Sequence, residues 1–156
     1  MARMEDMLKA AEQADMILML ENEKRIFSAK PEGMKDIVNT FPSPRLQTIF
    51  DPANYIEEGI SPYDQGWCQG LREITDYLHI KDKTPDLPGC VPAGEGEGQI
   101  PDILADMDSQ DRNYYMTLEP HIKNQGRFAQ LSKAEKFAEA ANGLKKLLQQ
   151  ANISFR

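Results

Sequence analysis

The sequence predicts an α/β protein built on a parallel sheet. Short apolar runs alternate with segments of helical periodicity, this alternation occurs four times along the chain, and polar residues and loops follow the apolar runs. Strands that alternate with helices pair in parallel, because each helix carries the chain back to the same end of the sheet. The 156 residues suit one domain with its own core, so we expect a single domain over 1–156 with its core within about 4–148.

The first half of the chain predicts two helices and two strands. Segment 2–14 has no Gly or Pro, and its apolar residues repeat at the spacing of one helix face: Met4, Met7, Leu8 and Ala11. Residues 16–20 are apolar at every position, as in a strand covered on both faces. Pro31 suits the first turn of a second helix that extends to Phe41, and the next strand spans 46–50.

The second half predicts the same alternation. Pro62 begins a third helix with three large residues directed inward: Trp67, Leu71 and Ile74. A strand over 77–80, a short helix over 101–107 and a strand over 114–118 follow. The final helix begins with a capping box at Ser132-Lys-Ala-Glu135 and has its own apolar stripe: Phe137, Ala141, Leu144 and Leu148.

A long loop interrupts this alternation. Four prolines and four glycines are concentrated between Thr84 and Pro101, which excludes a regular element there. Long ordered loops are uncommon unless they serve a site, so this segment is expected to lie near a functional region.

Ionisable residues stand where the predicted strands end. Glu21, Asp51 and Glu119 each follow an apolar run, and His79 lies near the end of another. Because the carboxyl ends of parallel strands meet at one face, these four residues are expected to converge. Three carboxylates and one imidazole suit Mn²⁺, Mg²⁺ or Co²⁺, with Zn²⁺ as an alternative, and leave positions free for substrate oxygens.

Each of these residues also has an ordinary structural interpretation. Acidic residues after a strand often cap the next helix, and Asp51 precedes Pro52 as a cap would. A lone histidine in a strand is more often a hydrogen-bonded core residue than a ligand. The metal hypothesis therefore rests on the coincidence of all four positions.

Five segments resemble the last four strands of the sugar phosphate isomerase/epimerase group, which belongs to the xylose isomerase-like TIM barrels. These segments are Leu20-Glu21-Asn22-Glu23-Lys24, Phe50-Asp51-Pro52-Ala53-Asn54, His79-Ile80-Lys81-Asp82, 91–98 (VPAGEGEG) and Leu118-Glu119-Pro120-His121. The resemblance runs in order over about 4–148. It implies a parallel (β/α) half-barrel that corresponds to the last four βα units of a TIM barrel.

The resemblance also implies a site and a chemistry. In this group the metal is held by a Glu, an Asp, a His and a Glu. By motif position, these ligands correspond here to Glu21, Asp51, His79 and Glu119. The two glutamates correspond to the acid/base pair of the ketose epimerases. A bound metal polarises the carbonyl of a sugar or sugar phosphate and stabilises an enediolate, while one carboxylate removes a proton and the other returns it.

Three further residues are expected to contact substrate: Asn54, Lys81 and Asp82. Asn54 matches a position where some relatives carry a substrate-contacting His, although it can also cap the following helix. Lys81 and Asp82 follow His79, and strand alternation directs one of them away from the site.

The resemblance covers only four of eight strands, which bears on partners. A complete TIM barrel takes about 250 residues, and an open half exposes apolar surface and two unpaired sheet edges. We therefore expect either a homodimer, in which two copies complete an eight-stranded closure, or association with a separate N-terminal half-barrel. A non-catalytic half-barrel that binds a metal or a protein partner is the alternative to an enzyme.

Composition narrows the remaining classes. The chain has 18 basic and 25 acidic residues, a net charge of −7 and no Lys/Arg cluster along the sequence, which argues against nucleic acid and ranks the endonuclease branch of the superfamily low. The run 16–20 is far shorter than the roughly 20 residues of a membrane span, and the N-terminus does not resemble a signal peptide. We expect a cytoplasmic protein. A dehydratase acting on a cyclic polyol would use a similar metal site and stays open.

Overall fold

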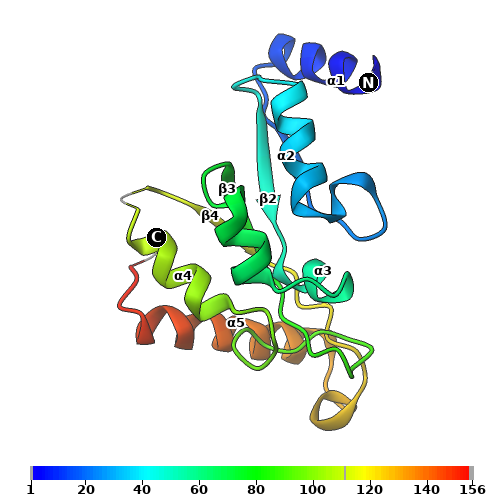
Figure 1. Ribbon diagram of the computed structural model, residues 1–156. Helices are drawn as coiled ribbons and strands as arrows, with labels where there is room; N and C mark the ends of the chain where they lie inside the picture. Colours follow the sequence, from blue (N-terminus) through cyan, green and yellow to red (C-terminus); the bar gives the residue numbers. More distant parts are fainter. Residues whose placement is uncertain (1, 111, 155–156) are drawn as a thin grey trace.

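The computed structural model describes residues 2–110 and 112–154, which form a four-stranded sheet flanked by helices (Figure 1). Its strands are β1 (Leu18–Glu21), β2 (Leu46–Phe50), β3 (Thr75–Ile80) and β4 (Tyr115–Leu118). They lie in the order β1-β2-β3-β4, and every neighbouring pair is parallel. The predicted parallel α/β architecture is confirmed.

The helices connect the strands. They are α1 (Ala2–Gln13), α2 (Pro31–Thr40), α3 (Pro52–Glu57), the π-helix η2 (Pro62–Leu71), α4 (Ile100–Asp108) and α5 (Lys133–Gln150), with short 3-10 turns η1 (Phe27–Ala29) and η3 (Gly126–Phe128). Figure 1 shows α1 and α5 at opposite ends of the molecule. Within the described residues, none of these helices combines the length and apolarity needed to cross a bilayer.

Several elements form for the local reasons that the sequence indicates. Pro31 occupies the first turn of α2, and the capping box of α5 is present with both of its hydrogen bonds, between Ser132 and Glu135. The predicted strand at 46–50 matches β2 residue for residue. The last helix therefore begins where its cap predicts.

Other boundaries differ from the prediction. β1 begins at Leu18, because Met16 and Ile17 lie before the ladder with β2 and are exposed. The six-residue helix α3 was not predicted. The segment after Pro62 is a π-helix interrupted by a kink at Gln69 and Gly70, and Gly70 has φ +106°, a left-handed conformation that a glycine adopts without strain. A β-carbon at Gly66 would lie 3.2 Å from the rings of Phe50 and Tyr55, so close packing of this helix favours glycine there.

The sheet has two different faces. Along β2 and β3 the buried side chains Phe50, Leu78 and Ile80 pack with residues of η2, α4 and α5 into one apolar core. Phe50 and Trp67 meet edge to face, with ring centroids 5.3 Å apart. In contrast, Tyr115 on β4 is 73% exposed. In the described part of the chain, β1 and β4 each pair with one strand only, so one face and both edges of the sheet are open.

Candidate metal centre at the carboxyl ends of the strands

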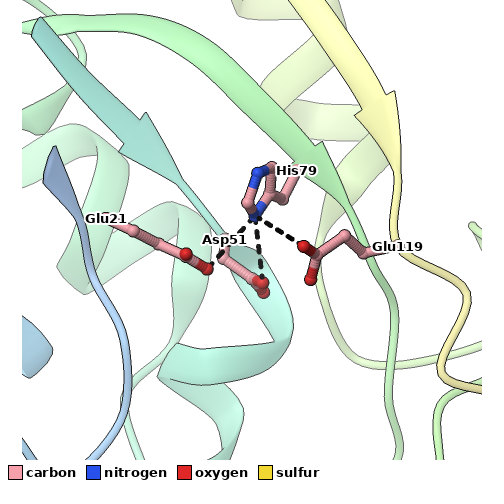
Figure 2. A group of neighbouring side chains, drawn as sticks. All are labelled: Glu21, Asp51, His79 and Glu119. Atoms are coloured by element: carbon pink, nitrogen blue, oxygen red, sulfur yellow. Dashed lines mark hydrogen bonds and ion pairs between the residues drawn. The ribbon is translucent and has the colours of Figure 1, made fainter. Parts of the chain in front are cut away.

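The parallel register brings four ionisable side chains to one place. Glu21 ends β1, Asp51 directly follows β2, His79 is the last but one residue of β3, and Glu119 directly follows β4. One potential ligand atom from each of the four lies within 4.8 Å of all the others (Figure 2). The convergence predicted from the strand ends is thus present in the structure.

The histidine lies at the centre of this group. Its Nδ1 is 3.1 Å from Glu21 Oε1, 3.6 Å from Glu119 Oε1 and 3.8 Å from Asp51 Oδ2. Figure 2 shows Glu21 and Glu119 on either side of it, with Asp51 between them. Three carboxylates and one imidazole that face a common centre form a donor set that fits a divalent cation.

The four side chains differ in burial. The Asp51 side chain is 0% exposed and that of His79 is 12% exposed, whereas those of Glu21 and Glu119 are 25% and 33% exposed. The inner strands therefore supply the fixed members of the group, and the outer strands supply the accessible ones. A small molecule can reach the two glutamates.

Asp51 caps a helix and also faces the cluster. Its Oδ1 accepts a hydrogen bond from the backbone N–H of Asn54 at 3.1 Å and caps α3. Its Oδ2 remains directed at His79 and at Lys81. The cap fixes the orientation of the carboxylate that faces the cluster.

Asn22 is a supporting residue that the sequence analysis did not identify. Its side-chain Nδ2 donates to the Asp51 carbonyl at 2.9 Å, and its Oδ1 accepts from the Asp51 N–H at 2.7 Å. This pair of bonds ties the end of β1 to the end of β2. An amide directly after the strand-end Glu21 was the available signal, but its partner is 29 residues away.

Lys81 and Asn54 join the cluster directly. The buried Lys81 Nζ donates to Asp51 Oδ2 at 2.9 Å and to Glu119 Oε2 at 3.3 Å, and lies 3.4 Å from Asn54 Oδ1. The Asn54 amide donates to Glu21 Oε1 at 3.1 Å. Burial disfavours the Lys81 ammonium, but the charges of Asp51 and Glu119 outweigh it and raise its pKa above the ordinary value. Both residues therefore lie at the cluster, and their contact with substrate stays a prediction.

Asp82 has a different position. Its buried carboxylate accepts hydrogen bonds from the backbone N–H groups of Lys83, Gly94, Gly96 and Gly98, at 2.8–3.0 Å. A β-carbon at Gly96 would lie 2.3 Å from Asp82 Oδ1, so the glycines allow the loop to wrap around the acid. The Asp82 oxygens thus hold the loop in this structure, and the substrate contact expected from the sequence stays a prediction.

The cluster holds a proton on His79 when no metal is bound. Burial lowers the pKa of His79, but hydrogen bonds to Asp51 and Glu21 and the charges of Glu21 and Glu119 act in the opposite direction and raise it to about 10. At neutral pH the imidazolium and the Lys81 ammonium thus offset the three nearby carboxylates.

Parallel strands that deliver carboxylates and a histidine to one cation-sized space define an α/β protein with a candidate metal centre at the carboxyl edge of its sheet. The model of the xylose isomerase-like TIM barrel family matches residues 1–147. The chain belongs to this family.

Solved structures agree on the fold. The probable 3-DHS dehydratase AsbF of Bacillus anthracis, involved in petrobactin synthesis, is 19% identical to this chain, with a TM-score of 0.70. The match covers 95% of this chain and 54% of the AsbF chain. A xylose isomerase domain protein of Planctomyces limnophilus is 19% identical, with a TM-score of 0.73, and the match covers 94% of this chain and 52% of that protein. Another xylose isomerase domain protein, from Alicyclobacillus acidocaldarius, is 16% identical, with a TM-score of 0.65, and the match covers 91% of this chain and 54% of that protein.

This chain therefore spans about half the length of the structures it resembles. Its four strands represent half of the eight in a complete barrel. A comparison with curated protein sequences gave no significant match.

We predict that the metal-free chain loses stability as pH rises from 6.5 to 9. A folded-state pKa above the ordinary 6.5 gives stability that is complete below 6.5 and is lost as pH rises through the folded value of about 10. The free energy of unfolding, measured by urea denaturation with a chelator present, is expected to fall over this range. His79→Asn is expected to abolish the slope, and His121→Asn, on a 63% exposed side chain, to keep it. An identical slope in both variants would contradict the assignment.

Proposed function

We propose that this chain acts as a divalent-metal-dependent isomerase or epimerase on a sugar or sugar phosphate, through an enediolate. The observation that supports this most strongly is the convergence of three carboxylates and one imidazole within 4.8 Å at the carboxyl ends of parallel strands. Glu21, Asp51, His79 and Glu119 would hold Mn²⁺, Mg²⁺ or Co²⁺, or alternatively Zn²⁺. When bound, the ion would polarise the substrate carbonyl and its neighbouring hydroxyl.

The two glutamates are suited to proton transfer. They come from the two outer strands and are the most exposed members of the cluster, on either side of His79. A carboxylate on each side of a bound substrate allows one to remove a proton from the carbon next to the carbonyl and the other to return a proton to the opposite face. Glu21 and Glu119 are thus the proposed acid/base pair.

Lys81 and Asn54 are proposed to position these groups and contact substrate. Lys81 is already within 3.3 Å of the Glu119 carboxylate, and Asn54 donates to Glu21, so each holds one member of the acid/base pair. An ammonium and an amide beside the cluster are also suitable hydrogen-bond partners for sugar hydroxyls. If the side chain of either residue turned to contact substrate, the buried Asp51 would stay in place, because Asn22 and the backbone N–H of Asn54 also hold it.

The open face and edges of the sheet support a partner that closes the barrel. β1 and β4 each lack a second neighbour in the described residues, and the relatives have about twice this length. We propose that a second copy of this chain supplies the other four strands by a two-fold rotation, with β4 of each copy beside β1 of the other. A non-catalytic half-barrel that binds a metal or a different protein is the alternative function.

The proposed activity predicts exchange of a substrate proton with solvent. We expect the purified chain with Mn²⁺ to exchange deuterium into C2 or C3 of a ketose or ketose phosphate, measured by NMR. Glu21→Gln and Glu119→Gln should each lower the rate by about 10²–10⁴-fold because each removes an acid/base group. Glu23→Gln, beside the site but outside the cluster, is the matched control.

Two outcomes would oppose this proposal. Equal exchange rates in wild type and both glutamine variants would remove the glutamates from the mechanism. Loss of water from the substrate, detected by mass spectrometry in place of exchange, would indicate the dehydratase alternative that the same metal set allows.

The proposed closure predicts a dimer. Light scattering is expected to give twice the 17.7 kDa mass of one chain, and Tyr115→Glu, at the 73% exposed tyrosine on β4, should shift the mass toward one chain. Glu95→Gln, on an exposed loop, should leave the dimer intact. A monomer at all concentrations would contradict the second copy, and recovery of a complex only with a separate N-terminal half-barrel would identify that occupant in its place.

A further inference from the structure

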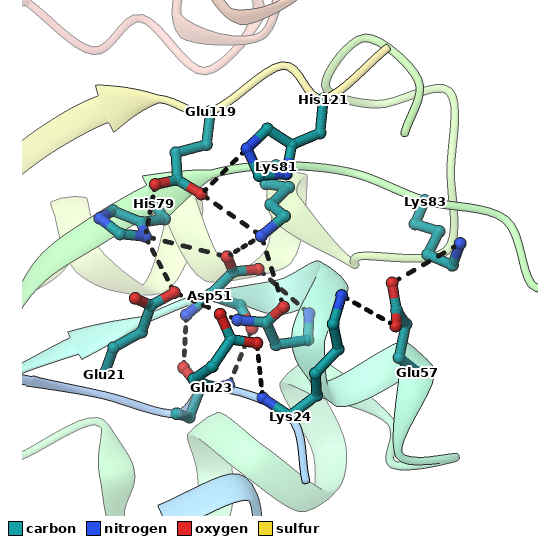
Figure 3. A network of polar contacts seen from close by, with 12 residues as sticks. Glu21, Glu23, Lys24, Asp51, Glu57, His79, Lys81, Lys83, Glu119 and His121 are labelled. Carbon is teal, nitrogen blue, oxygen red and sulfur yellow. Dashed lines mark hydrogen bonds and ion pairs between the residues drawn. The ribbon is translucent and has the colours of Figure 1, made fainter. Parts of the chain in front are cut away.

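A cavity of about 740 Å³ opens beside the group formed by Glu21, Asp51, His79 and Glu119, the four-residue cluster. It is lined by the loops that follow β1, β3 and β4 and by the end of α3. Two of its lining residues also touch the cluster. Lys81 donates to Asp51 and Glu119, and His121 Nε2 lies 4.0 Å from Glu119 Oε2 (Figure 3). A group bound in the cavity would therefore be next to the candidate metal.

The lining of the cavity is positively charged, although the chain as a whole is acidic. Five cations line it, against the carboxylates of Glu57 and Asp86. The cations are Lys24, Arg25, Lys81, Lys83 and Lys123. Because Lys81 is paired with Asp51 and Glu119, the other four cations exceed the two carboxylates by two positive charges, in one concave region of a protein with a net charge of −7. The sequence shows no Lys/Arg cluster, so the fold assembles this one from segments up to about 100 residues apart.

Internal ion pairs account for only part of this charge. The Glu57 carboxylate is shared between Lys24 at 3.0 Å and Lys83 at 3.8 Å. Lys81 is paired with Asp51 and Glu119 of the four-residue cluster. Among the described residues, the side chains of Arg25 and Lys123 form no ion pair, although the Glu58 carboxylate accepts a hydrogen bond from the Arg25 backbone N–H at 2.9 Å. The cavity therefore has unneutralised positive charge available for a ligand.

The backbone at the cavity also departs from common conformations. Arg25 has φ +60° and His121 has φ +41°, in the left-handed region that residues other than glycine rarely adopt. Both residues line this cavity. Such conformations concentrate where a side chain is held for a function.

We infer that this cavity binds an anionic substituent of the substrate, a phosphate or a carboxylate, while the reacting carbons lie at the four-residue cluster. The inference rests on the proposed function for the neighbouring cluster and narrows it to anionic substrates. The volume falls within the range of about 300–1,000 Å³ of small-molecule sites, and lysine and arginine are the side chains that bind phosphate and carboxylate oxygens. An anionic substituent would neutralise this charge, which a neutral sugar does not do.

The test uses inorganic phosphate and acetate as separate probes. Each anion is titrated into the ¹⁵N-labelled chain with a chelator present, and the dissociation constant is obtained from NMR shifts. The double variant Arg25→Gln/Lys123→Gln is compared with Lys145→Gln/Lys146→Gln, which removes the same charge from exposed positions on α5. We expect the cavity variant to weaken binding at least about fivefold and the control to match wild type.

Each outcome has a defined meaning. Tighter binding of phosphate than acetate would indicate a phosphorylated substrate, and the reverse would indicate a carboxylate, and both support the cavity. Equal binding by the two double variants, or no saturable binding of either anion, would overturn the inference. Mn²⁺ affinity, measured in parallel, separates the two proposals: a wild-type chain that binds phosphate but no Mn²⁺ rejects the metal-dependent function and keeps the anion site, and the converse rejects only the anion site.

Discussion

The structure depends on holding three carboxylates in the space of one cation. Glu21, Asp51 and Glu119 face a common centre, and the mutual repulsion of two charges about 4 Å apart costs about 1 kcal/mol in water and about 4 kcal/mol near a protein surface. In the metal-free chain, the raised pKa of His79 and the buried ammonium of Lys81 offset this repulsion. A divalent cation would offset it more completely, which explains why such an arrangement is suited to metal binding.

The sheet supplies the constraint that overcomes the repulsion. Parallel hydrogen-bonded ladders fix the four strand ends relative to one another, and Asn22 and the cap of α3 fix the orientation of the most buried carboxylate. The apolar core on the other face, around Phe50 and Trp67, stabilises these strands. Packing on one face of the sheet thus stabilises the strands enough to hold three mutually repelling carboxylates at their carboxyl ends.

The sequence allowed the strand-end residues to be predicted because their signal is local. A short apolar run that ends in an acidic residue marks Glu21, Asp51 and Glu119, and parallel pairing then predicts their convergence. The supporting contacts were harder to predict. The sequence indicated Lys81 and Asp82 as substrate contacts, but it did not show that Lys81 pairs with Asp51 or that Asp82 holds the glycine-rich loop, because these partners are distant in sequence. The basic cavity has no sequence signal at all, and the helix α3 was too short for periodicity to show it.

Mn²⁺ titration of the purified chain tests most directly whether the four-residue cluster binds one divalent cation. We expect about one Mn²⁺ per chain and an affinity that is lower by more than about 100-fold in Asp51→Asn, because loss of a ligand costs more affinity than loss of an outer hydrogen-bond partner. Glu23→Gln should bind as wild type does. A folded chain that binds no Mn²⁺, or an Asp51→Asn variant that keeps full affinity, would contradict metal binding by the cluster.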